Sequence, residues 1–425
     1  MSQPTTDPGD PNEPVGPAGP TGPADPADVA AAPGEDALDP LRDAEDEVLA
    51  ELEESLQESE HNDLYPYQAI VLTSFGGPEG PEEVMPFLRR VTAGRGVPDE
   101  RLAEVAEHYQ QFGGKSPIND QNRRLVEELR AELDRRGLPV PVLLGNRNSE
   151  PFLTDALREA HEQGMTQVLS ITTSAYSSYS SCRQYREDIA AALDTLVGED
   201  RVLHVDKVRQ YWNHPGFSRA NARIVTEGAR SVLEGGPAPH LVFVTHSLPV
   251  SMDDTSGPGD DEGNLYSVQH QELAAAITRE ASATLGADLD HDLTYCSRSG
   301  PPTQDWLVPD VNDHLRALAQ RGVQHVVLAP IGFISDHMEV VFDLDTEAVE
   351  TAEELGMTLL RVPTVGIDTE FVMGLVDLAV ERAAQARGED VETPTWPGND
   401  PRPAVCLPGC CPNLRQARPA ACGSD

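Results

Sequence analysis

Acidic residues crowd directly behind an apolar run in the C-terminal half of the sequence. The run HVVLAPIGF (325–333) leads into a segment that contains Asp336, His337, Glu339, Asp343, Asp345 and Glu347. If a helix begins near Asp336, then Glu339, Asp343 and Glu347 share one face, because positions four apart are neighbours on a helix. A solvated acidic face explains Asp343 and Glu347 equally well. A row of carboxylates leading inward is also the path that a hard divalent cation needs.

A histidine stands at the end of a second apolar run. His246 follows HLVFV within the motif THSLP, and Pro249 stops the extended segment soon after. Such a histidine is about as often a structural residue as a ligand. An imidazole that faces Glu339 can bind a borderline metal such as Fe(II), or move protons near neutral pH. The two residues therefore define a candidate metal or acid–base site.

Two further segments carry polar groups suited to a ligand. SAYSSYSSCRQYRED (174–188) sets Tyr176, Tyr179 and Tyr185 among serines and two arginines. Phenol and guanidinium groups suit a flat ligand with carboxylates, although a polar loop over a sheet edge fits the same pattern. The glycines of FGGPEGPEEV (75–84) could cradle a phosphate at a helix N-terminus. Neither GxGxxG nor a Walker lysine is present, so a nucleotide site is not favoured.

Four of the six cysteines lie near the C-terminus, at Cys406, Cys410, Cys411 and Cys422. A disulfide framework is not expected in a chain that reads as intracellular. Zinc sites usually show paired CxxC spacing, which this tail lacks. Clustered thiolates without histidine suit an iron–sulfur cluster, and an exposed reactive tail is the alternative. A fourth cluster ligand would have to come from Cys182 or Cys296.

The elements that must position these residues alternate between strands and helices. Strands are predicted at 67–75, 139–146, 167–175, 201–206, 240–247, 292–297, 325–333 and 358–366, with amphipathic helices between them. This alternation predicts parallel sheets covered on both faces. Eight strands could close one barrel, but the long stretch after Asp206 favours two doubly wound halves. Every motif above except the cysteine tail follows the carboxyl end of a predicted strand, which is the ligand-binding edge of open α/β sheets.

Composition limits the partners and the location. The net charge of −41 argues against nucleic acid and anionic membranes as partners. No apolar run approaches the roughly 18–20 residues that cross a bilayer, and no secretory signal is recognised. We therefore expect a cytoplasmic protein. Residues 1–63 hold 18 acidic residues and one base, with dense proline, and are predicted to form a disordered arm without a catalytic role.

Six segments together resemble the ferrochelatase family, whose members insert ferrous iron into a porphyrin. They are SFGGPEGPEEV, GGKSPIND, GNRN, THSLP, YCSRSGPP and GFISDHMEV, in this order between about Tyr67 and Arg387. The resemblance implies two Rossmann-like domains of the chelatase type facing across a cleft. We place them at 64–206 and 207–366, followed by a helix packing back at 367–390 and a cysteine-containing tail at 391–425. The sequence is most similar to actinobacterial members, which act on coproporphyrin III and can carry a 2Fe–2S cluster.

The resemblance also implies roles for individual residues. His246 and Glu339 match the positions that bind iron and assist removal of the pyrrole protons, and the family's acidic iron path falls on Asp343 and Glu347, on a helix that can be π-like. Ser116 and Tyr185 match porphyrin-contacting positions. Candidates for the propionates are Tyr109, Arg89 and Arg95.

The expected cluster ligands are Cys182, Cys406, Cys410 and Cys411, with Cys422 spare. Two positions depart from the family: Phe75 stands where related coproporphyrin enzymes can place a metal-facing tyrosine, and Cys296 replaces a usual glutamine. The expected substrates are ferrous iron and coproporphyrin III, in haem b synthesis, and contact with other haem-pathway enzymes is expected to be transient. The alternatives are a protoporphyrin IX ferrochelatase, a cobalt chelatase, and a non-catalytic porphyrin or haem carrier.

Overall fold

The computed structural model describes residues 62–94, 96–259, 263–300, 303–398 and 400–424. Apart from its last two residues, the predicted arm at 1–63 lies outside this part of the chain, as does Arg95. Within it, no helix is both long enough and apolar enough to cross a membrane.

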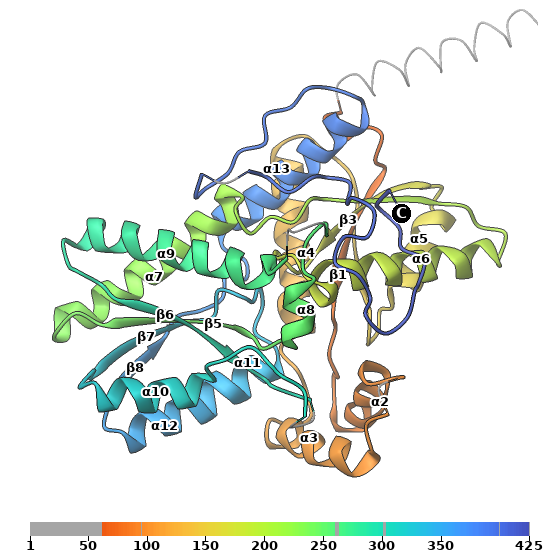
Figure 1. The fold of residues 1–425 in the computed structure, drawn as a ribbon. Coiled ribbons are helices and arrows are strands. Elements are labelled where there is room, and N and C mark those ends of the chain that lie inside the picture. The colour runs from red at the N-terminus through yellow and green to blue at the C-terminus, as the bar shows by residue number, and fades with distance from the viewer. Residues whose placement is uncertain (1–61, 95, 260–262, 301–302, 399, 425) are drawn as a thin grey trace, which may run out of the picture. The chain divides into compact units, whose positions relative to one another are not determined.

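Eight parallel strands form two separate four-stranded sheets, so the prediction of two doubly wound halves is confirmed and a single barrel is excluded (Figure 1). The first sheet has the order β2-β1-β3-β4 and the second β6-β5-β7-β8. The strands are β1 (Ala69–Ser74), β2 (Val142–Asn146), β3 (Gln167–Thr172), β4 (His204–Lys207), β5 (His240–His246), β6 (His291–Cys296), β7 (His325–Ala329) and β8 (Thr358–Arg361). The two orders are equivalent, and each reverses direction at one point, between β1 and β3 or between β5 and β7.

The first half also contains α2 (Pro81–Val91), α3 (Asp99–Gln111), α4 (Ile118–Arg135), α5 (Leu153–Glu162), the π-helix η1 (Tyr179–Arg183) and α6 (Gln184–Val197). The second half contains α7 (Pro215–Gly235), α8 (Val250–Asp254), α9 (Leu265–Leu285), α10 (Val311–Gln320), α11 (Met338–Phe342), the π-helix η2 (Asp343–Glu347), α12 (Ala348–Glu354) and α13 (Thr369–Ala386).

Helices cover both faces of each sheet, which explains why the strands are apolar on both sides. In β5, Leu241 and Phe243 pack into one core with α7 and α9, whereas Val242 and Val244 pack into another with α10 and α12. Successive side chains on a strand point to opposite faces, so a strand buried on both must be continuously apolar. Figure 1 shows the two helix pairs on opposite sides of the second sheet.

Several predicted strands end earlier than expected. β3, β7 and β8 stop at Thr172, Ala329 and Arg361, and the apolar residues that follow belong to loops. Ile331 and Val365, for example, lie in these loops and are buried in the main core. Hydrophobic patterning detects burial, which these loops share with the strands, and therefore overestimates strand length.

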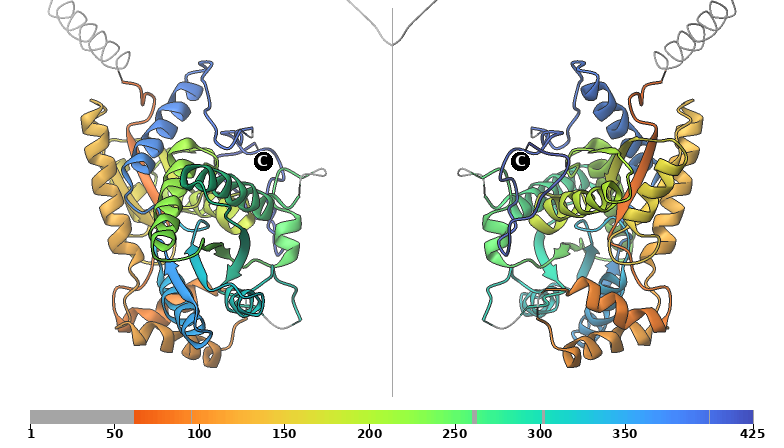
Figure 2. Two further views of the ribbon diagram at one scale, coloured as in Figure 1. Left: turned by 90° about the vertical axis from the view of Figure 1, so that its left-hand side faces the viewer. Right: turned by 90° about the vertical axis from the view of Figure 1, so that its right-hand side faces the viewer.

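Helix α13 packs on both α4 and α7, and so joins the two halves (Figure 2). Gly216 of α7 and Gly374 of α13 meet at the crossing, where a Cβ atom built on Gly216 would lie 2.6 Å from the Gly374 Cα. Two glycines let the helix backbones approach closely, since any larger residue would separate them. The exact domain limits at 206 and 366 stay a prediction.

Candidate metal and porphyrin site

His246 and Glu339 come together at the point where the strand order of the second sheet reverses. His246 is the last residue of β5, and Glu339 lies in the first turn of α11, which follows β7. The His246 Nε2 atom is 3.4 Å from the Glu339 Oε2 atom, and the side chains are 30% and 48% exposed. Both are thus packed by protein yet reachable from solvent, at the edge where ligands bind in open α/β sheets.

A glycine and a histidine cap hold this pair in place. The loop after β7 passes close to β5 at Gly332. A Cβ atom built on Gly332 would lie 2.1 Å from the Thr245 Oγ1 atom, so only glycine fits here. His337 then caps α11, because its Nδ1 atom accepts a hydrogen bond from the Glu339 backbone N–H at 3.2 Å. A side-chain acceptor at this position satisfies one of the open N–H groups of a helix start. The first turn of α11 is therefore fixed beside His246.

The electrostatics of the pair favour a proton acceptor. Burial alone would lower the pKa of His246. The hydrogen bond of the protonated ring with Glu339, the charges of Glu339 and Asp343, and the Ser247 carbonyl together outweigh burial and raise the pKa above its usual value. His246 Nδ1 contacts the Ser247 carbonyl oxygen at 2.5 Å, an acceptor only, so Nδ1 carries the donated hydrogen. Nε2 of the neutral ring is then free of hydrogen and can accept a proton or bind a metal.

The acidic residues that follow divide into two groups. Asp336 and Asp345 pair with Arg361 at 3.3 and 2.5 Å. Asp343 instead bonds to the Ser297 hydroxyl and lies near Glu339. Burial raises the pKa of Asp343 to about 7, against the lowering effect of Ser297.

The π-helix η2 runs from Asp343 to Glu347, so the spacing predicted for a regular helix is wrong here and the π-like character implied by the resemblance is found. A π turn is wider than an α turn and is frequent at functional sites. Glu347 lies at its end and is exposed, and partial desolvation together with the charges of Asp310 and Glu350 raises its pKa as well. The structure thus brings Glu339, Asp343 and Glu347 into one electrostatically coupled row.

A loop and two helices of the first half lie against this site. Tyr176, behind β3, donates to the Ile331 carbonyl at 2.9 Å, and the Asp336 N–H donates to the Gln121 side chain at 2.8 Å. Tyr109 of α3 packs with Met338 of α11, and its pKa is raised by burial and by the charge of Glu339. The carboxyl edge of the second sheet therefore contacts the first half through the loop after β3 and through α3 and α4.

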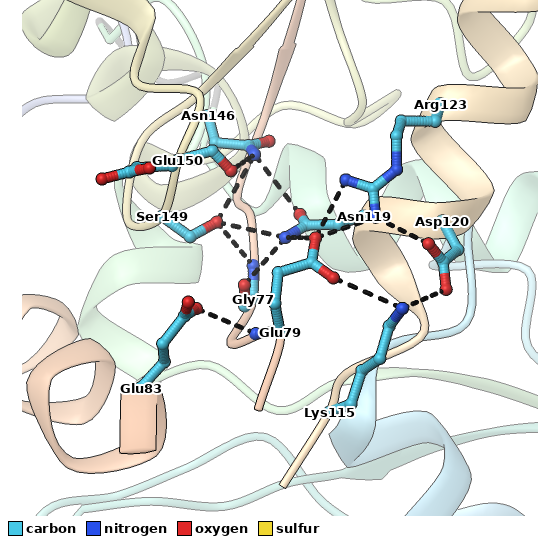
Figure 3. Close-up of polar contacts among 10 residues, drawn as sticks. All are labelled: Gly77, Glu79, Glu83, Lys115, Asn119, Asp120, Arg123, Asn146, Ser149 and Glu150. Atoms are coloured by element: carbon cyan, nitrogen blue, oxygen red, sulfur yellow. Dashed lines mark hydrogen bonds and ion pairs between the residues drawn. The ribbon is translucent and has the colours of Figure 1, made fainter. Parts of the chain in front are cut away.

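A buried polar network shapes the loop after β1 (Figure 3). The Gly77 N–H donates to Ser149 Oγ at 3.0 Å, and Asn119 Nδ2 donates to the Gly77 carbonyl at 2.8 Å. Ser116, which is 2% exposed, lies directly behind: a Cβ on Gly77 would be 2.6 Å from the Ser116 Cβ. The motifs FGGPEG, GGKSPIND and GNRN thus meet in one structure, with glycine required for the close approach.

The remaining porphyrin candidates lie apart from one another. Tyr185 is buried at the start of α6, with the Arg147 guanidinium 4.6 Å from its ring centroid. Arg89 is exposed on α2 and pairs with Asp99 at 2.9 Å. Arg147, to which no role was assigned, has a side chain that is only 6% exposed; it pairs with Asp188 and also contacts the Phe75 ring. Its only signal in the sequence was its place in the quoted motif GNRN.

Four cysteines gather in a buried cluster made of Cys182, Cys406, Cys410 and Cys411. The Cys182 and Cys406 sulfurs are 3.9 Å apart, and those of Cys410 and Cys411 are 3.8 Å apart. Hydrogen bonds from the Cys182 and Cys410 thiols lower the pKa of Cys406, and Lys207 acts in the same direction.

The other two cysteines lie elsewhere. Cys422 points to the Val205 carbonyl oxygen at 3.1 Å, and Cys296 ends β6 beside Ser297. The hydrogen bonds that the Cys182 and Cys410 thiols make within the cluster, together with burial, raise the pKa of these two thiols. The four converging sulfurs suit the four-cysteine ligand set of a 2Fe–2S cluster, so Cys182, Cys406, Cys410 and Cys411 fit this group.

Fold and site together define a two-domain α/β protein with a histidine–carboxylate pair at a sheet switch point. The sequence model of the family described as Ferrochelatase matches residues 67–383. This chain belongs to the ferrochelatase family.

Its similar relatives include the protein named "Coproporphyrin III ferrochelatase" of Leifsonia xyli subsp. xyli, which is 48% identical over 84% of this chain and 94% of the relative. The protein of the same name from Streptomyces coelicolor is 49% identical over 85% and 98% of the two chains. Among solved structures, SirB from Bacillus subtilis with Fe3+ has a TM-score of 0.45 at 11% identity, covering 76% of this chain and 98% of SirB.

Proposed function

We propose that this protein inserts Fe2+ into coproporphyrin III and yields iron-coproporphyrin III in haem b biosynthesis. The proposal is supported by family membership and by the names of relatives such as those of Leifsonia and Streptomyces. The observation that carries the chemistry is the 3.4 Å approach of His246 and Glu339 at the switch point of the second sheet. Iron and the porphyrin are substrates in this scheme.

Insertion requires the macrocycle to lose two pyrrole protons as iron enters. His246 is the proposed acceptor of the two protons in turn, since Nε2 of its neutral ring faces the site. Glu339, which is 3.4 Å away and 48% exposed, stabilises the imidazolium and passes each proton on toward solvent before the next is taken up. Glu339, Asp343 and Glu347 form the proposed iron path, because carboxylate oxygens bind divalent cations and Asp343 interacts with the charges of the other two. Distortion of the bound porphyrin needs about 1–5 kcal/mol, which binding of its propionates and ring faces can offset.

The first test is anaerobic insertion of Fe2+, followed by loss of porphyrin fluorescence, with coproporphyrin III and protoporphyrin IX side by side. Faster turnover of coproporphyrin III supports the proposal. Preference for protoporphyrin IX keeps the chemistry and changes the pathway, and binding of both without insertion indicates a carrier. His246→Ala is expected to abolish insertion while porphyrin still binds, and His161→Ala on α5 is the control.

We also propose that Cys182, Cys406, Cys410 and Cys411 hold a 2Fe–2S cluster. When bound, such a cluster supplies one-electron redox chemistry, and no step of the insertion proposed above depends on it. Cys182→Ser is expected to lose visible colour and acid-labile sulfide, whereas Cys422→Ser keeps both, because Cys422 lies outside the buried cluster. Colourless wild-type protein that contains zinc would overturn this assignment. The cytoplasmic location and the transient contact with haem-pathway enzymes stay predictions.

A further inference from the structure

A second set of metal-ligating side chains lies at the opposite edge of the second sheet. His240 is the first residue of β5, Asp292 is the second residue of β6, and His314 lies in α10. The Oδ2 atom of Asp292 is 2.8 Å from His240 Nε2 and 3.0 Å from His314 Nε2. One nitrogen or oxygen atom from each residue lies within 4.8 Å of the others. Because β5 rises about 3.3 Å per residue, this cluster is roughly 20 Å from His246.

The three side chains have the arrangement of an open metal site. Two imidazoles and one carboxylate are common ligands of Zn2+ and of neighbouring divalent transition metals. Around such an ion, with bonds of about 2.0 Å, tetrahedral ligand atoms lie roughly 3.3 Å apart, so only small movements are needed here. The His240 and His314 side chains are 5% and 12% exposed, whereas Asp292 is 38% exposed and opens the site to solvent. Water can complete the coordination from that side.

The surrounding charges are mixed. Asp290 adds a negative charge beside Asp292, and both act on His240 and on the neighbouring His291. On the positive side, Arg279 acts on His291, and the Arg321 Nη1 atom lies 3.8 Å from Asp292 Oδ2. The Arg321 side chain is 58% exposed, so it can turn into solvent when a cation replaces it. A hydrogen-bonded structural triad is the competing explanation, and it binds no metal.

We propose that His240, Asp292 and His314 bind one divalent transition-metal cation, for which Zn2+ is the reference ion, at a site separate from iron insertion. The cation would join the starts of β5 and β6 to α10. The inference does not rest on the proposed ferrochelatase activity, since it uses none of the residues at the other edge of the sheet.

The test is a Co2+ titration of the full chain that carries His246→Ala and Glu339→Ala, which removes the proposed iron ligands. Nitrogen and oxygen ligation gives visible d–d bands, whereas binding to the tail cysteines adds sulfur-to-cobalt charge-transfer bands, so the two sites are separable. One equivalent of Co2+ without sulfur bands, displaced by Zn2+, is expected. Removing a residue that only hydrogen-bonds to a metal ligand typically weakens metal binding by roughly 10–100-fold. His314→Ala removes a proposed ligand itself, so adding it is expected to weaken Co2+ binding by more than this.

Two further variants separate metal binding from folding. His204→Ala is the matched control, because His204 on β4 also faces an aspartate, Asp206, at 3.4 Å and belongs to no three-residue cluster of this kind in the described chain. Asp292→Asn keeps an amide oxygen for the imidazoles but removes the charge. Zn2+ is expected to raise the melting temperature of the parent and of His204→Ala, but not of Asp292→Asn. No Co2+ bound by the parent, or equal binding after His314→Ala, overturns the proposal.

Discussion

The acidic residues behind β7 differ in their partners, and the partners indicate their roles. Asp345 forms a close ion pair with Arg361, which neutralises it. Asp343, two positions earlier, has a hydroxyl partner and lies beside the His246–Glu339 pair, so its charge is not cancelled. A buried carboxylate without a cationic partner holds its proton more strongly, and an incoming cation favours its release.

Asp343→Asn is predicted to raise the KM for iron and leave porphyrin binding unchanged. The pKa of Asp343 is raised to about 7, so the carboxylate is mostly protonated below pH 7 and mostly charged above it. In the wild-type protein the KM for iron should therefore fall as pH rises through about 7, and this step should vanish in Asp343→Asn. Initial rates at several pH values measure it. Asp345→Asn is the control, and a pH step that survives in Asp343→Asn contradicts the role.

Short structural elements carry most of the functional residues, and each is held by specific contacts. The loop after β1 depends on the close packing of Gly77 against Ser116 and on its hydrogen bonds to Asn119 and Ser149. The turn before α11 depends on the His337 cap. The buried backbone N–H and C=O groups of such loops are not paired with a neighbouring strand, so side chains have to form hydrogen bonds with them.

Gly77→Ala is predicted to destabilise the protein by about 1–3 kcal/mol, the usual range for overpacking, and to weaken porphyrin binding by displacing Ser116. The added methyl group would lie 2.6 Å from the Ser116 Cβ atom. Gly80→Ala is the matched control in the same loop, because its nearest neighbours, at 3.1 Å and beyond, are atoms of the flexible Glu82 side chain. Thermal unfolding and porphyrin titration measure both effects. Equal losses in the two variants would contradict the steric argument.

The two halves of the molecule are tied together by buried polar groups as well as by apolar packing. Arg209, in the connection after β4, pairs with Glu381 of α13 at 2.7 Å, and the two side chains are 1% and 6% exposed. Near them, His214 caps the start of α7, where its Nδ1 atom accepts a hydrogen bond from the Gly216 N–H at 3.2 Å. The ion pair requires a charged Glu381, because a buried charge needs its partner. The helix cap requires a His214 Nδ1 atom without hydrogen, because this atom accepts the hydrogen bond.

Removing one partner of the Arg209–Glu381 pair is predicted to destabilise the protein more than replacing both partners with apolar residues. Arg209→Met leaves an unpaired buried carboxylate and should lower the free energy of unfolding by about 3–5 kcal/mol. The double variant with Glu381→Leu should recover most of this loss, since apolar side chains need no partner. Urea unfolding of the two single variants and the double variant measures the coupling. Additive losses would show that the pair is not energetically linked.

The free energy of unfolding is predicted to decrease as the pH falls below about 6.5, because His214 becomes protonated more readily in the unfolded protein. Burial and the charge of Arg209 lower the pKa of His214 to about 3 in the folded protein, whereas the unfolded value is near 6.5. A lowered folded pKa means that the contribution is fully present above 6.5 and is lost as pH falls towards 3, by up to about 1.4 kcal/mol per pH unit. His214→Asn can cap α7 without titrating, so its unfolding free energy should fall less steeply. An unchanged slope would exclude His214 as a cause.

Much of the fold could be read from the sequence. The eight strands, the two sheets, the placement of His246 at a strand end and that of Glu339 in the first turn of the helix that follows β7 all agree with local patterns. Strands buried on both faces must be apolar, and chain reversals need particular residues. Strand ends were overestimated where buried loops continued the apolar pattern.

The amino-acid sequence therefore suffices for the fold class and for the motifs that mark the candidate iron site. Cysteine spacing alone left Cys182 and Cys296 open, and the expected set with Cys182 is the one that the structure brings together. The sequence did not reveal the contact of Arg147 with Tyr185 or the cluster of His240, Asp292 and His314. Each of these depends on residues far apart in the chain. Their proximity results from the strand order and from the return of the tail, which are long-range contacts that no local pattern of residues encodes.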